Sequence, residues 1–136
     1  MVKVILNINI RTIPHKKQRY ETVGDWIWSN IKERLDRSKL TIKVSDMGDW
    51  RMEFLVAFHE QIETVLCSLR NIKQRDVDNF DKEFESRRVS GNCDEPGDDP
   101  NAPYYKEHQF ATKLERMLAK ELGLNWEEYE AKINSL

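Results

Sequence analysis

A histidine and two glutamates stand close together in one segment of the chain, which reads HEQIE from His59 to Glu63. Apolar residues around this segment recur every three or four positions, and the spacing predicts a long helix over about residues 50–70. At about 100° per residue, His59 and Glu63 fall on one face of that helix, inside its apolar sector, whereas Glu60 points toward the rim of the sector. Burying an ionised carboxylate is costly unless the group is paired or binds a metal ion.

Two interpretations of the buried pair stay open. In one, His59 donates a ring proton to Glu63 and the two side chains satisfy each other. In the other, both bind a divalent metal ion, because a histidine and a carboxylate four residues apart on a helix can direct a nitrogen and an oxygen at one point. The segment by itself is compatible with either interpretation.

Ionisable side chains also border the apolar stripes of two further predicted helices, over about residues 76–87 and 103–122. These side chains are Asp81, His108 and Glu115. If the three helices pack together, the groups converge on His59 and Glu63. We therefore predict a divalent metal centre, with zinc as the expected ion, and a network of salt bridges among the same groups is the competing prediction. The predicted ligands are His59, Glu63 and His108, with Asp81 as a further candidate.

The HEQIE segment, on a helix that follows a small predicted sheet, resembles the active-site helix of the zincin metallopeptidases. In that family two histidines four residues apart bind zinc, and the glutamate after the first histidine is the general base. The resemblance implies a metal-dependent hydrolase in which His59 is a ligand, Glu60 is the catalytic base and His108 is the third ligand. This chain departs from the family at Glu63, which stands where the second histidine belongs.

The whole chain also resembles a group of small bacteriophage and prophage proteins. The features that carry this resemblance are RTIPH (residues 11–15), QRY with TVGDW (18–20 and 22–26), HEQIE, and EPGDDP (95–100) leading into Ala102, Pro103 and Tyr104. The resemblance implies a phage-type accessory protein in the cytoplasm of a host cell. It implies no particular activity.

The charge balance argues against nucleic acid as the main partner. Lys and Arg number 22 against 24 Asp and Glu, for a net charge of -2, whereas nucleic-acid binders usually carry a basic excess or stripe. One short basic cluster contains Arg11, His15 and Arg19, and Arg19 could donate two hydrogen bonds to a phosphate. This cluster favours an alternative function, a non-enzymatic module that binds a host protein or a small anionic or nucleotide ligand.

The cysteines and apolar runs predict a reduced, cytosolic compartment. Cys67 and Cys93 are the two cysteines, and neither belongs to a Cys-x-x-Cys pair, which excludes a disulfide framework and a zinc ribbon. The first residues lack the pattern of a signal peptide. The longest strongly apolar run, residues 54–58, is too short to span a membrane.

Length and periodicity predict one α+β domain over residues 1–136, with a sheet region (1–46) and a helical region (47–136). Alternating apolar and polar residues predict three strands, and we expect a small three-stranded antiparallel sheet followed by three or four helices. Residues 30–37 fit either a helical turn or an extended connection. The acidic segment 89–103 is predicted to be a loop. It lacks the ligand spacing of an EF-hand, so we expect it to be solvated and not to bind calcium. The expected strands lie at residues 2–10, 25–28 and 40–45, and a loop over residues 11–24 joins the first two.

Overall fold

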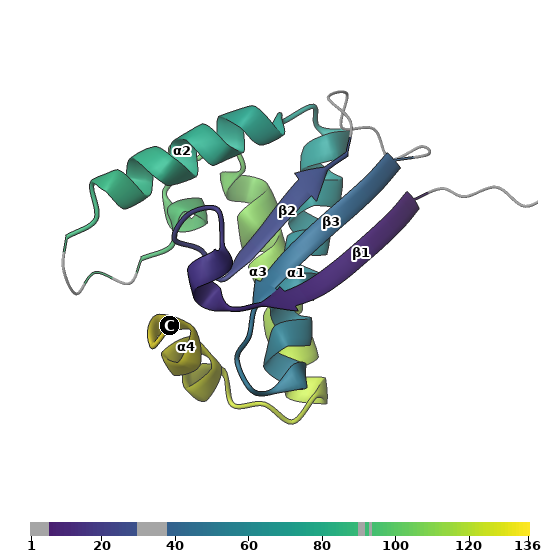
Figure 1. The fold of residues 1–136 in the computed structure, drawn as a ribbon, viewed down its shortest axis with the longest axis vertical. Helices are drawn as coiled ribbons and strands as arrows, with labels where there is room; N and C mark the ends of the chain where they lie inside the picture. Colours follow the sequence, from purple (N-terminus) through teal and green to yellow (C-terminus); the bar gives the residue numbers. More distant parts are fainter. Residues whose placement is uncertain (1–5, 30–37, 90–91, 93) are drawn as a thin grey trace, which may run out of the picture.

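The computed structural model describes residues 6–29, 38–89, 92 and 94–136 (Figure 1). Within these residues, three strands precede four helices, which confirms the α+β class. The undecided segment 30–37 and the start of the first predicted strand lie outside the described residues. The elements are β1 (Leu6–Ile13), β2 (Gly24–Trp28), β3 (Ser38–Ser45), α1 (Trp50–Leu69), α2 (Gln74–Ser86), α3 (Tyr105–Glu121) and α4 (Trp126–Asn134), with two short 3₁₀ turns, η1 (His15–Lys17) and η2 (Pro96–Asp98).

The sheet is mixed, so the prediction of a purely antiparallel sheet was wrong. Its strand order is β1-β3-β2, with β2 antiparallel to β3 and β1 parallel to β3. Successive strands run in opposite directions, so the first and third strands run in the same direction. In a meander, β3 would pair only with β2 and all pairs would be antiparallel. Here β3 lies between β1 and β2, so β1 and β3 are parallel neighbours.

The burial of β3 explains its central place. Leu40, Ile42 and Val44 point to one face and are at most 1% exposed, and burying each such side chain stabilises the fold by about 1.5–3 kcal/mol. Most of β1 is exposed, as suits an edge strand. Its pairing with β3 continues to Ile13, beyond the predicted end of the strand, because β3 supplies hydrogen-bonding partners that far.

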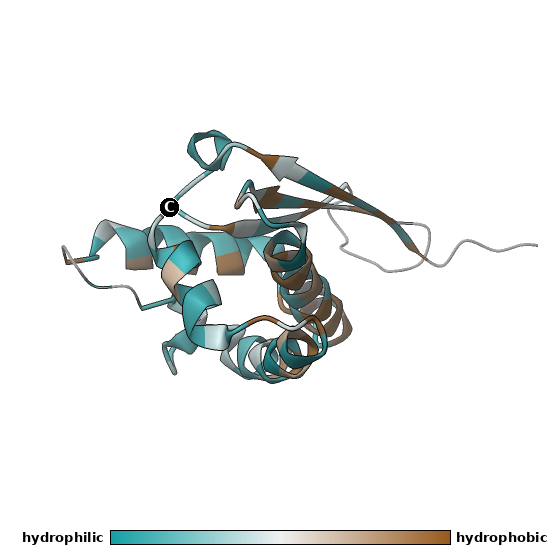
Figure 2. Ribbon diagram, turned by 90° about the horizontal axis from the view of Figure 1, so that it is seen from below, coloured by the Kyte–Doolittle hydropathy of each residue, from teal (hydrophilic) through white to brown (hydrophobic). Residues whose placement is uncertain are grey.

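Helix α1 lies between the sheet and α3. It packs against β2, β3 and α3, and Figure 2 shows the sheet on one side of the molecule with the helices on the other. The indole nitrogen of Trp28 donates to Thr64 Oγ1 at 2.9 Å and ties β2 to α1. Arg51 at the start of α1 donates to the carbonyl of Leu122 just after α3, so α1 and α3 run antiparallel.

Local signals determine where the helices begin and end. Asp49 accepts a hydrogen bond from the backbone N–H of Arg51 and caps α1, and Asn125 caps α4 in the same way. Gly123 follows α3 with a φ of 71°, a left-handed conformation that glycine adopts without steric cost. The start of α1 at Trp50 agrees with the predicted start, and the end of α3 at Glu121 lies one residue before the predicted end. No helix within the described residues is long and apolar enough to cross a membrane.

Candidate metal centre

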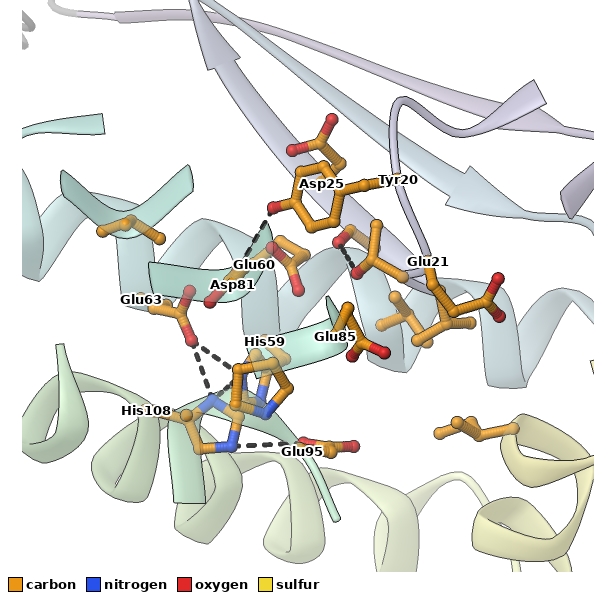
Figure 3. A pocket seen from close by; sticks show the side chains of 18 of the residues that line it. Tyr20, Glu21, Asp25, His59, Glu60, Glu63, Asp81, Glu85, Glu95 and His108 are labelled. Carbon is orange, nitrogen blue, oxygen red and sulfur yellow. Dashed lines mark hydrogen bonds and ion pairs between the residues drawn. The ribbon is translucent and has the colours of Figure 1, made fainter. Parts of the chain in front are cut away.

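The antiparallel packing of α1 and α3 brings His59, Glu63 and His108 together (Figure 3). His59 Nε2 lies 3.1 Å from Glu63 Oε2 and 3.1 Å from His108 Nδ1, and His108 Nδ1 lies 2.9 Å from Glu63 Oε2. All three side chains are buried. Ligand atoms that surround a zinc ion tetrahedrally at about 2.0–2.2 Å are roughly 3.3–3.6 Å apart. The three atoms therefore need to separate by only a few tenths of an ångström to hold such an ion.

The far side of the His59 ring is held by a carboxylate. His59 Nδ1 lies 2.8 Å from Glu115 Oε1, and Glu115 Oε2 accepts a hydrogen bond from the Tyr129 hydroxyl at 2.5 Å. Because an ionised carboxylate only accepts, the proton of a neutral His59 ring stays on Nδ1. The lone pair of Nε2 then points toward Glu63 and His108, which is the arrangement common in metal-bound histidines.

Glu63 is oriented by the sheet. The indole nitrogen of Trp26, in β2, donates to Glu63 Oε1 at 3.1 Å. This bond occupies one carboxylate oxygen and leaves Oε2 directed at the two histidines. Trp26 is buried in the core, and it also positions a candidate ligand.

The η2 turn holds the far side of the His108 ring. Nε2 of His108 lies 3.2 Å from Glu95 Oε2 and 3.4 Å from Asp98 Oδ1. The backbone of Gly97 lies against the ring, because a Cβ built there would be 2.3 Å from His108 Cγ and 2.4 Å from Nδ1. A side chain at position 97 would therefore displace the imidazole.

The charged neighbours shift the pKa values of the three candidate ligands. Burial lowers the pKa of His59, but the carboxylates of Glu115 and Glu63 outweigh burial and raise it to about 10. Burial likewise opposes a charge on His108, yet the carboxylates around it raise its pKa well above the usual range. Burial raises the pKa of Glu63, but the two histidines outweigh this effect and hold the pKa below its ordinary value. The carboxylates thus favour a positive charge on the two rings.

Glu60, the predicted base, lines the same cavity of about 280 Å³ as the three candidate ligands. Its side chain is half-buried against β2, and a Cβ at Gly24 would lie 2.8 Å from Glu60 Cγ and Oε1. Burial, followed by the nearby carboxylate of Glu63, raises the pKa of Glu60 well above its usual value. Among the described residues no side chain or backbone group donates a hydrogen bond to the Glu60 carboxylate, which leaves it free to contact a ligand.

The structure does not bring Asp81 into the triangle of ligand atoms. Instead Asp81 accepts hydrogen bonds from the hydroxyls of Tyr20 at 3.1 Å and Tyr104 at 2.5 Å. Burial raises the pKa of Asp81 to about 7, and the carboxylates of Glu63 and Asp78 add to this shift while the tyrosines oppose it.

The raised pKa of Asp81 predicts a dependence of stability on pH. The folded protein retains a proton on Asp81 that the unfolded chain loses above its ordinary carboxyl pKa of about 3.9. The free energy of unfolding should therefore fall as pH rises from about 4 to 7, by on the order of 3 kcal/mol. Asp81→Asn should remove this part of the slope in urea unfolding with EDTA present, whereas Asp76→Asn, an exposed site on the same helix, should keep it. An unchanged slope in Asp81→Asn would assign the shift to another group.

The basic cluster of the predicted alternative site makes mainly internal contacts. Arg19 donates to both oxygens of Asp25 at 2.7 and 2.9 Å and also pairs with Asp78 at 3.1 Å. His15 contacts Ser45 at 2.8 Å and Glu21 at 2.9 Å. Arg11 is exposed and contacts Asn9. The guanidinium of Arg19 therefore links Asp25 of β2 to Asp78 of α2 at the wall of the pocket.

Sequence reasoning included Glu115 among the groups around the candidate ligands but missed the others. Glu95 and Asp98 were assigned only to a solvated loop, although their spacing of three residues in Glu-Pro-Gly-Asp suits one turn of 3₁₀ helix. The sequence pattern indicates only that Trp26 and Tyr129 are apolar residues, and it does not predict their hydrogen bonds to Glu63 and Glu115.

A scan against protein families, a search of curated proteins and a search of solved structures each found no match to this chain. The resemblances to zincins and to phage proteins therefore stay predictions.

Proposed function

We propose that this protein is a metal-dependent hydrolase in which His59, Glu63 and His108 bind zinc and Glu60 is the general base. The observation that carries the proposal is the triangle of two imidazole nitrogens and one carboxylate oxygen, with sides of 2.9–3.1 Å. Trp26 from β2, Glu115 from α3 and Glu95, the residue before η2, contact these groups from behind.

Protons alone satisfy this triangle poorly. If only one of the two inner ring nitrogens carries a proton, its N–H group can donate to the other two atoms of the triangle. The third contact then joins two atoms that have only lone pairs and repel each other. With both rings protonated at the inner nitrogen, two N–H groups crowd each other at 3.1 Å, and His59, which also keeps its proton on Nδ1 against Glu115, is cationic. A cation in the centre accepts all three lone pairs at once, which favours the metal over the competing salt-bridge network.

The donor set suits zinc in a catalytic role. One carboxylate and two imidazoles are common ligands of catalytic zinc, and three protein ligands leave the fourth position for water. Bound zinc lowers the pKa of that water to about 7 and so supplies a nucleophile at neutral pH. Glu60 follows His59 directly and lines the same cavity, where it can accept the proton of the water.

Removal of the metal tests the proposal. Protein purified without a histidine tag should contain zinc, and EDTA should lower its melting temperature by on the order of 5–10 °C, because binding energy is lost from the folded state. Glu63→Gln should lose one equivalent of zinc and most of this response. Glu83→Gln, an exposed glutamate on α2, is the matched control and should behave like the wild type. A wild-type protein that neither contains zinc nor takes it up would rule out the proposed function.

A further inference from the structure

The second ring nitrogen of His108 has no adequate partner. The side chain is only 7% exposed, yet Nε2 makes no hydrogen bond within the described part of the chain. Glu95 and Asp98 lie close to it, at 3.2 and 3.4 Å, but neither oxygen is well aligned with an N–H group on that nitrogen. A buried nitrogen that faces two carboxylates without a hydrogen bond calls for an explanation, and a cation shared by the three groups supplies one.

The η2 turn holds the two carboxylates on the same side. A 3₁₀ helix has three residues per turn, so residues three apart are eclipsed. The Asp98 N–H donates to the Glu95 carbonyl at 3.0 Å and closes this turn, and Gly97 lets the turn lie directly on the His108 ring. One oxygen each from Glu95 and Asp98 and a nitrogen of His108 all lie within 4.8 Å of one another.

Charge supports a cation between these groups. Within the described residues, neither Glu95 nor Asp98 forms an ion pair with a lysine or arginine, and Asp98 accepts only from the neutral amide of Gln109 at 2.9 Å. Two carboxylates that converge repel each other unless positive charge lies between them, and the His108 ring carries at most one positive charge, which it shares with Glu63. Their side chains are 48% and 51% exposed, so an ion can enter from solvent and keep water ligands.

We propose a second cation site, formed by His108 Nε2, Glu95 and Asp98, so that His108 bridges an inner and an outer metal ion. The bridge rests on the proposed function, whereas the outer site does not depend on it. A donor set of one imidazole and two carboxylates suits a divalent ion such as zinc or manganese. When both ions are bound, His108 has released both ring protons to solvent and is an imidazolate, so that each of its nitrogens donates one lone pair.

Zinc stoichiometry tests the second site. In equilibrium dialysis against zinc, the wild type should bind two equivalents. The double variant Glu95→Gln/Asp98→Asn should bind one, because it keeps only the inner site. Glu63→Gln should also bind one, at the outer site. Asp94→Asn removes an exposed charge from the same loop, and as the matched control it should still bind two.

The outcomes separate the two proposals. A single equivalent in the wild type that survives in the double variant overturns the outer site and leaves the inner site intact. A single equivalent that is lost in the double variant but kept in Glu63→Gln supports the outer site and overturns the proposed function. Absence of bound zinc overturns both. Circular dichroism of each variant checks that a lost equivalent reflects lost ligands and not lost folding.

Discussion

Replacing Gly97 by alanine is expected to weaken zinc binding about 10–100-fold, although position 97 supplies no ligand. The new Cβ would lie 2.3–2.7 Å from three atoms of the His108 ring, far inside van der Waals contact. The neighbouring Asp98 N–H is held by the Glu95 carbonyl, so the backbone of the turn resists movement and the imidazole has to rotate. Its Nδ1 then leaves the triangle with His59 and Glu63.

Gly24→Ala is the matched control for this experiment. Its Cβ would also be overpacked, at 2.7 Å from Val56 Cγ1 and 2.8 Å from Glu60, but none of these atoms belongs to a candidate ligand. Overpacking of this kind costs about 1–3 kcal/mol in either variant. Zinc affinity, measured by competition with a chromophoric chelator, should fall in Gly97→Ala and stay near the wild-type value in Gly24→Ala. Equal affinity in both variants would mean that His108 does not bind the ion.

Helical periodicity predicted the half of the site that lies within one helix. His59 and Glu63 share a face of α1 because residues four apart on a helix are neighbours, and this relation is local. Their partner His108 depends on how α3 packs against α1, which spacing along the chain does not determine. His108 became a candidate because it borders the apolar stripe of its own helix and because the zincin resemblance implies a third ligand.

The parts that could not be predicted depend on contacts between distant segments. The mixed sheet follows from β3 inserting between β1 and β2, and alternation within each strand carries no information about strand order. The docking of Glu95 and Asp98 against His108 needs η2 to fold back over α3. Trp26 reaches Glu63 from the sheet, and an apolar pattern hides the indole N–H that makes this contact.

Glu60→Gln is expected to reduce hydrolysis by about 10²–10⁴-fold while zinc stays bound, because this range is typical of the loss of a general base. Glutamine keeps the size and the packing of Glu60 against Gly24 but cannot accept a proton from water. The three ligand atoms and their supporting groups do not include Glu60. The variant therefore separates binding from chemistry.

The assay for this prediction needs no knowledge of the natural substrate. Zinc-bound water attacks activated esters, so release of 4-nitrophenol from 4-nitrophenyl acetate reports the nucleophile directly. Glu63→Gln should lose the rate together with inner-site zinc, whereas Glu60→Gln should lose the rate and keep the zinc. Gly24→Ala, which pushes on the Glu60 side chain, should fall between Glu60→Gln and the wild type. A Glu60→Gln protein that hydrolyses the ester at the wild-type rate would show that another group accepts the proton.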